Sequence, residues 1–179
     1  MKILFLDIDG VLNTIESLNS AKSNTTDPLP EEYEVIQITS QPYLATLALR
    51  SIIPELVSNL NTLVDSLNID GIVIHSNWRK TFSLYFIKAV LEYHGLKGKV
   101  IGETPHHFDG QMFSEQQSKG KEIKDWLDNH SDVDFYIILD DENIFHGMKR
   151  LYNFFQINPL KGLTSITVET IKTNLVRME

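Results

Sequence analysis

The sequence contains no cysteine. Disulfide bonds, thiolate nucleophiles and cysteine zinc sites are therefore excluded, and nothing indicates an oxidising compartment. No apolar run approaches the ~18 residues that a membrane-spanning helix needs, and the short apolar stretch after Met1 and Lys2 leads directly into charge, too soon for the core of a signal peptide. We therefore expect a soluble cytoplasmic protein with no membrane partner.

Basic residues are also few: 16 Lys and Arg stand against 24 Asp and Glu, a formal net charge of -8. Non-specific binding of nucleic acid depends on Lys and Arg that neutralise phosphates, so this balance disfavours a general nucleic-acid binder, although a local basic patch stays compatible with it. An acidic protein that handles anionic substrates needs a metal ion or clustered basic side chains at its site.

Four short runs are apolar throughout, as expected of parallel strands that are buried on both faces. They are residues 2–6, 71–75, 99–102 and 135–139. Amphipathic helical patterns lie between them and a short terminal helix follows the last, which predicts an α/β Rossmann-like three-layer sandwich with a central parallel sheet. A chain of 179 residues, 42% hydrophobic, fits one domain over residues 1–179.

Two helical patterns carry further expectations. Residues 54–67 repeat leucine and valine at helical spacing after Pro54, a residue that suits a first helical turn. Residues 81–94 are aromatic and aliphatic on most sides, and we expect the aromatic side chains from 82 to 93 to belong to the core.

Residues 13–50 differ from the rest of the chain. A polar stretch with two prolines is followed by YEVIQIT, in which apolar and polar residues alternate. That alternation is typical of an edge strand or a hairpin arm. We expect a small flap or cap inserted after the first strand, too short to be a domain of its own.

Three of the apolar runs end in polar groups that carry chemistry. Asp7 ends the first, Ser76 follows the second, and Asp140 and Asp141 end the fourth. Parallel strands bring their carboxyl ends to one crevice, so these side chains should converge. Two like charges at ~4 Å cost about 4 kcal/mol at an intermediate dielectric, so a cation is required. Mg²⁺ is a suitable cation, because it is hard and prefers oxygen ligands such as carboxylates.

A protein cation is also available near the start of a later helix. Lys119 in SKGKEIKDWL is the candidate, and Lys121 is the alternative.

Simpler interpretations account for each feature taken alone. Asp-Gly is common in turns, a serine after a strand is often a helix cap, and an acid often ends a strand. A calcium-binding loop is excluded, since no glutamate closes it in register after Asp9. His106, His107 and Asp109 suggest a transition-metal site, but no further ligands follow at zinc spacing, which favours a solvated loop. The acidic residues, the hydroxyl and the lysine occur in order at the ends of strands and helices, and this combination favours a catalytic site.

Several segments together resemble the haloacid dehalogenase (HAD) superfamily of phosphatases, and most closely the HAD domain associated with bacterial RNA-repair proteins. The resemblance covers residues 1–12 and roughly 52–170, which leaves the insertion uncovered. The segments that carry it are DIDGV, IVIHSNWRK, KGKEIKDWLDNH, YIILDDEN and the later GLT.

The resemblance implies roles for the acidic residues. Asp7 would be the nucleophile that forms an aspartyl-phosphate, and Asp9 the general acid and base. Asp7 and Asp140 would hold Mg²⁺ directly with the backbone carbonyl of Asp9, while Asp141 would support the metal through water or orient Lys119.

The resemblance also implies a phosphate-binding set. Ser76 and the neighbouring backbone amides would hydrogen-bond the phosphoryl oxygens, and Lys119 would offset negative charge. Gly10, Asn77 and Arg79 are expected to line the substrate site, with Arg79 at the rim of the crevice in reach of a phosphate. We expect Trp78 to be a packing residue.

The sequence thus predicts a Mg²⁺-dependent phosphomonoester hydrolase. Asp9 favours phosphate chemistry over dehalogenation, because a halide leaving group needs no proton. The insertion is too small to enclose a small molecule, which together with the resemblance favours a nucleotide or an RNA or DNA terminal phosphate. The acidic charge favours instead a small phosphorylated metabolite or a phosphoprotein. A third alternative is a non-catalytic phosphate-binding module of HAD fold.

Overall fold

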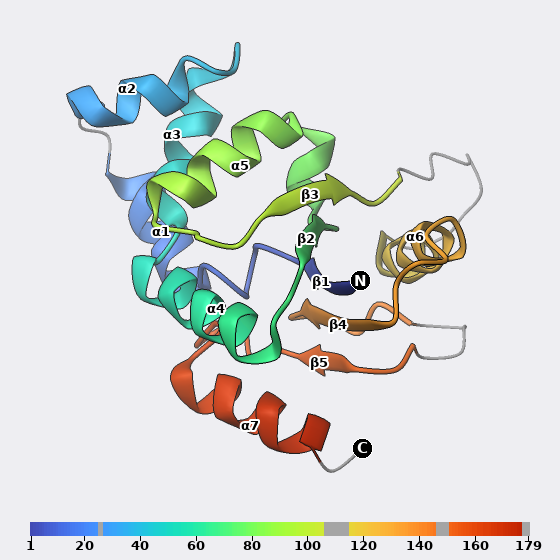
Figure 1. Cartoon of the computed structure of the whole chain (residues 1–179). Coiled ribbons are helices and arrows are strands. Elements are labelled where there is room, and N and C mark those ends of the chain that lie inside the picture. The colour runs from blue at the N-terminus through green and yellow to red at the C-terminus, as the bar shows by residue number, and fades with distance from the viewer. Residues whose placement is uncertain (25–26, 106–114, 146–150, 177–179) are drawn as a thin grey trace.

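The computed structural model describes residues 1–24, 27–105, 115–145 and 151–176, without the side chains of 115–118 and 176. Strands and helices alternate along most of the chain (Figure 1). The strands are β1 (Lys2–Leu6), β2 (Gly71–Ile74), β3 (Val100–Glu103), β4 (Phe135–Asp140) and β5 (Phe154–Gln156). The helices are α1 (Ile15–Ser23), α2 (Pro30–Ile36), α3 (Pro42–Ser51), α4 (Pro54–Leu67), α5 (Leu84–Tyr93), α6 (Glu115–Asp128) and α7 (Ser165–Val176), with a short 3-10 helix, η1 (Asn77–Lys80).

The strands form one parallel sheet in the order β3-β2-β1-β4-β5. β1 lies in the middle, with β2 on one side and β4 on the other, so the ends of these three strands are neighbours. The four predicted strands are confirmed within one residue at each end. β5 was not predicted, because it is only three residues long and its Gln156 is exposed at the sheet edge.

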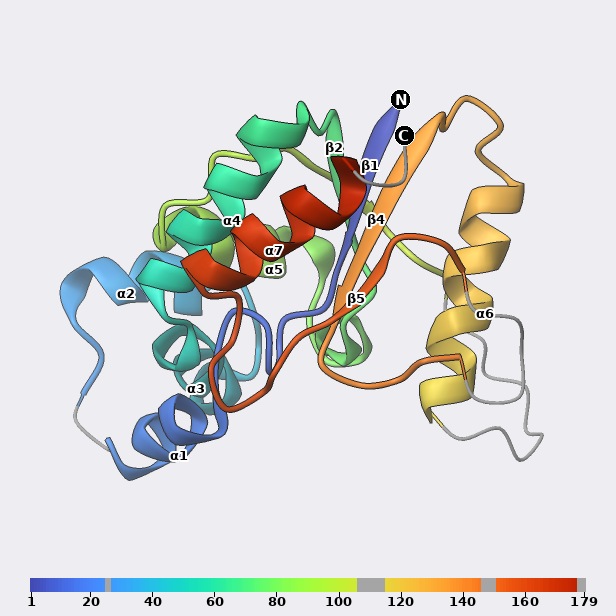
Figure 2. The same cartoon turned by 90° about the horizontal axis from the view of Figure 1, so that it is seen from below.

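Helices cover both faces of the sheet, which explains why the strands are apolar throughout. Figure 2 shows α6 on one side, with α4, α5 and α7 on the other. Alternate residues of β1 divide between the two cores: Ile3 and Phe5 pack with Trp126 of α6, whereas Leu4 and Leu6 join the larger core on the opposite face. The expected Rossmann-like three-layer arrangement is confirmed.

The insertion is helical, so the expectation of a strand at YEVIQIT was wrong. Pro30 opens α2, and the Glu32 side chain accepts a hydrogen bond from the Leu29 backbone N–H at 2.7 Å, which satisfies a donor at the helix start. Glu32 also pairs with Arg50 of α3 at 2.8 Å. These contacts, and burial of Val35 and Ile36 against the main core, outweigh the local alternation.

One further expectation needs adjustment. In α5, Tyr85 is 70% exposed and Tyr93 is 40% exposed, so the aromatic residues from 82 to 93 are not all core. Phe82 and Phe86 are buried as expected.

Within the ranges that the structure describes, no helix combines the length and apolar character that crossing a membrane requires.

Candidate active site

The ends of β1, β2 and β4 bring the predicted polar residues together. The backbone N–H of Asp7 donates to the Leu139 carbonyl at 3.0 Å, and that of His75 donates to Leu6 at 3.0 Å, so the ladders continue to the edge of the sheet. Asp7, Ser76 and Asp140 are almost completely buried there. The predicted convergence at the carboxyl edge follows from this strand order.

Three carboxylates form a cluster at this edge. Asp7, Asp140 and Asp141 each offer an oxygen, and these atoms all lie within 4.8 Å of one another. The donor set is made of carboxylate oxygens alone, as a hard cation such as Mg²⁺ prefers. The side chain of Asp9 does not belong to this cluster, and the expected contribution of its backbone carbonyl stays a prediction.

Lys119 reaches the cluster from α6. Its Nζ donates to Asp7 Oδ2 at 2.7 Å and to Asp140 Oδ2 at 3.0 Å, while the side chain is only 4% exposed. Lys121 is exposed, so Lys119 is the lysine that contacts the carboxylates. It lies in the second turn of α6 rather than at the entrance, because the helix already begins at Glu115.

The charges in this cluster shift one another's ionisation. Burial alone would lower the pKa of Lys119, but the Asp7 and Asp140 carboxylates outweigh it and raise the pKa above the ordinary value. Burial alone would raise the pKa of Asp7, but the lysine charge prevails and lowers it. Lys119 and Asp7 therefore stay an ion pair.

The other two carboxyls hold protons more tightly. Burial, and after it the charge of Asp7, raises the pKa of Asp140 to about 8 and that of Asp141 to about 6. One lysine thus does not neutralise three carboxylates. The donor chemistry and the repulsion between neighbouring carboxylates both fit a bound divalent cation.

Asp9 lies on the turn after β1, and donors hold both of its oxygens. Trp78 Nε1 donates to Oδ2 at 3.0 Å, and Asn13 Nδ2 donates to Oδ1 at 2.7 Å. Burial, and to a lesser extent the Asp7 charge, raises the pKa of Asp9. The expectation that Trp78 packs is confirmed by its contact with Phe82 (5.9 Å between ring centroids), but its bond to Asp9 was missed.

Gly10 lets the chain turn close against β4. Its φ is +72°, a conformation that favours glycine, and a Cβ atom there would lie 2.5 Å from the carboxylate carbon of Asp141. The Gly10 N–H donates to Asn13 Oδ1 at 2.9 Å. These contacts give Gly10 a role in the turn, and its contact with a substrate stays a prediction.

Ser76 and Arg79 lie at the start of the segment after β2. The Ser76 hydroxyl caps η1 by accepting from the Trp78 N–H at 3.4 Å, and hydrogen bonding to Ser76 contributes to the low pKa of Asp7. Asn77 is the first residue of η1 and is partly buried. The roles of Ser76 and Asn77 toward a phosphate stay predictions.

The sequence led us to expect Arg79 at the rim of the crevice, but the structure places it in the interior. Its side chain is fully buried, pairs with Glu122 of α6, and donates from Nη1 to the Ser76 carbonyl at 3.0 Å. The arginine therefore connects the Ser76 segment to the helix that carries Lys119. Its expected contact with a substrate phosphate stays a prediction.

His75 was not singled out from the sequence, although it lies beside Ser76. It is fully buried; its Nε2 donates to the Leu139 carbonyl at 3.1 Å, and its Nδ1 lies 3.6 Å from Asp140 Oδ2. Burial lowers its pKa to about 3, so the ring is neutral at pH 7. The histidines of ETPHHFDG, with Asp109, lie outside the described residues.

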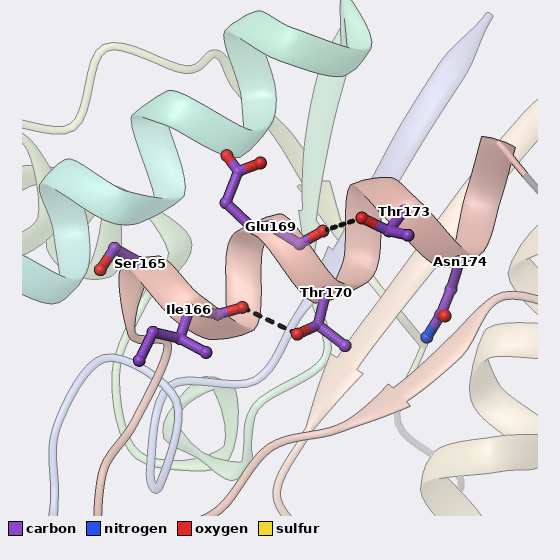
Figure 3. Close-up of a pocket in the computed structure, with 6 residues that line it drawn as sticks. All are labelled: Ser165, Ile166, Glu169, Thr170, Thr173 and Asn174. Carbon is purple, nitrogen blue, oxygen red and sulfur yellow. Dashed lines mark hydrogen bonds between the residues drawn. The ribbon is translucent and has the colours of Figure 1, made fainter.

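A separate, open hollow runs along the outer face of α7 (Figure 3). Two threonine hydroxyls on this face bond to their own helix: Thr170 donates to the Ile166 carbonyl at 2.8 Å and Thr173 to that of Glu169 at 2.8 Å. None of the residues that line this hollow belongs to the carboxylate cluster, so we assign it no function.

A parallel α/β sheet with an acidic cluster and a buried lysine at its carboxyl edge has the architecture of the HAD proteins. The family model of the HAD domain in Swiss Army Knife RNA repair proteins matches residues 3–168, and the chain belongs to this family. The match includes the insertion, which the sequence resemblance had left out. Among curated proteins and among solved structures, none matches the chain significantly. Family membership supports a phosphatase-type hydrolase, and HAD domains generally use Mg²⁺.

Proposed function

We propose that the protein is a Mg²⁺-dependent phosphomonoesterase that works through an aspartyl-phosphate. The arrangement that supports this most strongly is the buried contact of Asp7 with Lys119 beside Asp140 and Asp141, with Asp9 outside the cluster on the same turn. A lysine that keeps Asp7 ionised suits a carboxylate nucleophile.

In the first step, a carboxylate oxygen of Asp7 attacks phosphorus and the bond from phosphorus to the leaving oxygen breaks. Asp9 gives its proton to that oxygen, so an alcohol departs. In the second step, Asp9 accepts a proton from water as the water oxygen attacks phosphorus. The bond to Asp7 then breaks, which releases phosphate and restores the carboxylate.

The remaining residues bind and compensate charge. Lys119 balances negative charge on Asp7 and the phosphoryl group, and Ser76 with its neighbouring amides binds phosphoryl oxygens. Asp7, Asp140 and Asp141 would hold Mg²⁺, and the bound ion would offset the negative charge of the phosphoryl oxygens.

We propose a nucleotide or a nucleic-acid terminal phosphate as the substrate. The family description names RNA repair proteins, which supports a phosphorylated nucleic-acid end. The net charge of -8 favours the second candidate, a small phosphate ester, because few basic residues are available along the chain to hold a long polyanion.

Hydrolysis of p-nitrophenyl phosphate with Mg²⁺ and with EDTA tests the reaction, with Asp7→Asn as the control. Activity that needs both the metal and Asp7 is the expected result. A wild type inert on a panel of phosphate esters, or an equally active Asp7→Asn variant, would overturn the mechanism. Comparison of 3′- and 5′-phosphorylated oligonucleotides with mononucleotides then identifies the substrate class.

A further inference from the structure

Asp9 is held from two directions by side chains that the proposed mechanism does not use. Trp78 follows β2 and donates to one carboxylate oxygen, whereas Asn13 follows β1 and donates to the other. We propose that Trp78 and Asn13 are positioning residues that fix Asp9 as the proton donor to the leaving oxygen, an inference that rests on the proposed function.

The indole of Trp78 has little freedom to move. The side chain is buried, packs edge-on against Phe82, and belongs to the 3-10 helix that Ser76 caps. Indole N–H is a donor only, so at this position it can bond an acceptor such as Asp9 and cannot compete for the proton that Asp9 carries. The bond therefore sets the direction of Asp9 relative to Ser76.

Asn13 is fully buried and uses both ends of its amide. Its Oδ1 accepts from the Gly10 N–H at 2.9 Å, which requires Nδ2 to face Asp9. The same Nδ2 lies 3.4 Å from the hydroxyl of Ser51 at the end of α3. Asn13 thus connects Asp9, its own turn and the last helix of the insertion.

Two donors on different oxygens fix both the position and the rotation of a carboxyl group. Each carboxylate oxygen has two lone-pair positions, so one donor on each leaves Asp9 able to carry a proton. A general acid must lie within hydrogen-bond reach of the leaving oxygen, and a displacement of about 1 Å can cost about 10²-fold in rate. Loss of either donor should therefore impair proton transfer.

The leaving group provides a readout that general damage to the fold would not change. A p-nitrophenolate leaves without a proton, whereas an unsubstituted phenolate or an alkoxide depends on one. A loosened Asp9 should therefore make the rate fall more steeply as the leaving group becomes more basic. The measurement is kcat/KM for a series of substituted aryl phosphates and one alkyl phosphate.

Trp78→Phe is the first variant, because it removes the donor and keeps an aromatic ring. We expect at least a roughly 10-fold larger loss of kcat/KM on phenyl phosphate than on p-nitrophenyl phosphate, within the 10²–10⁴-fold that a general acid supplies. Trp126→Phe is the matched control: Trp78 and Trp126 are both 8% exposed, and Trp126 packs on Phe5 and His130. The control should lower all rates equally or not at all.

Asn13→Ala tests the second donor independently. Its matched control is Asn61→Ala, which also removes a buried amide. The Asn61 amide donates to the Gly95 carbonyl and accepts from the Lys97 N–H. We expect only Asn13→Ala to steepen the dependence on the leaving group, with folding of each variant checked by circular dichroism.

The outcomes separate the two proposals. If the wild type is active but Trp78→Phe and Asn13→Ala lose the same factor on every substrate, the positioning role is wrong and the proposed function stands. If the wild type hydrolyses no phosphate ester with Mg²⁺ present, the proposed function falls and this inference falls with it.

Discussion

Arg79 on η1 and Glu122 on α6 form an ion pair between side chains that are 0% and 2% exposed. The pair joins the segment that begins at Ser76 to the helix that carries Lys119. Trp78 of η1 belongs to one of the two hydrophobic cores, whereas Ile123 and Trp126 of α6 belong to the other. Because a buried charge is stable only when it is paired, each of the two residues depends on the other.

Arg79→Met should destabilise the protein by about 3–5 kcal/mol, because it removes the guanidinium that pairs with the buried Glu122 carboxylate. Urea denaturation monitored by circular dichroism measures the loss. The double variant Arg79→Met/Glu122→Leu should recover most of the loss, since both charges of the pair are then absent. A single variant as stable as the double one would contradict this account.

Lys119→Met should lower kcat on p-nitrophenyl phosphate by about 10²–10³-fold, as loss of one preorganised electrostatic donor commonly does. The reason is that Asp7 and Asp140 lose the cation they both contact. Lys121→Met is the control, because Lys121 lies on the same helix and is exposed. Equal losses in the two variants would show that the charge of α6, and not the contact, matters.

Mg²⁺ should raise the thermal unfolding temperature, because the proposed site is the carboxylate cluster of the folded protein, and the unfolded chain would not offer this site. At a concentration about 100 times its Kd the gain is about 2.7 kcal/mol. Asp141→Asn should weaken this gain, and Asp65→Asn, which changes an exposed acid on α4, should leave it intact. Titration calorimetry gives the affinities directly. Equal stabilisation of both variants would place the ion elsewhere.

The Glu32–Arg50 pair predicts a pH effect on stability. Hydrogen bonding to Arg50 lowers the pKa of Glu32 below its ordinary value of 4.5 despite burial. A carboxyl with a lowered folded pKa binds fewer protons than in the unfolded chain, so its stabilisation is complete above that ordinary value and is lost as pH falls through the folded value.

Glu32→Gln should therefore cost about 2 kcal/mol at pH 7, and the difference from the wild type should shrink as the pH falls below about 4.5. Urea denaturation at a series of pH values measures it. The adjacent Glu31 is exposed, and Glu31→Gln should show neither the cost nor the pH dependence. A constant difference across the series would mean that the charge of Glu32 contributes nothing.

The sheet and the acidic cluster were predictable because their signals are local. Strands buried on both faces are apolar throughout, and the polar residue at each strand end marks the edge where ligands bind. The convergence of Asp7, Ser76 and Asp140 follows from these two facts alone, before any side-chain geometry is known.

The contacts between distant residues were not predictable from any local pattern. Trp78 meets Asp9 across 69 positions and Arg79 meets Glu122 across 43, and nothing near either residue indicates its partner. YEVIQIT was misread for the same reason, since Arg50, 18 positions after Glu32, helps to hold α2 in place.

Gly10 has a consequence for the dimensions of the site. A single methyl group at this position would push Asp141 away by overlapping its Cβ and carboxylate atoms, which would lie 2.5–2.6 Å from it. The separation between the turn that bears Asp9 and the end of β4 is thus set by the absence of a side chain. Any other residue there would move Asp9 and the carboxylate cluster apart.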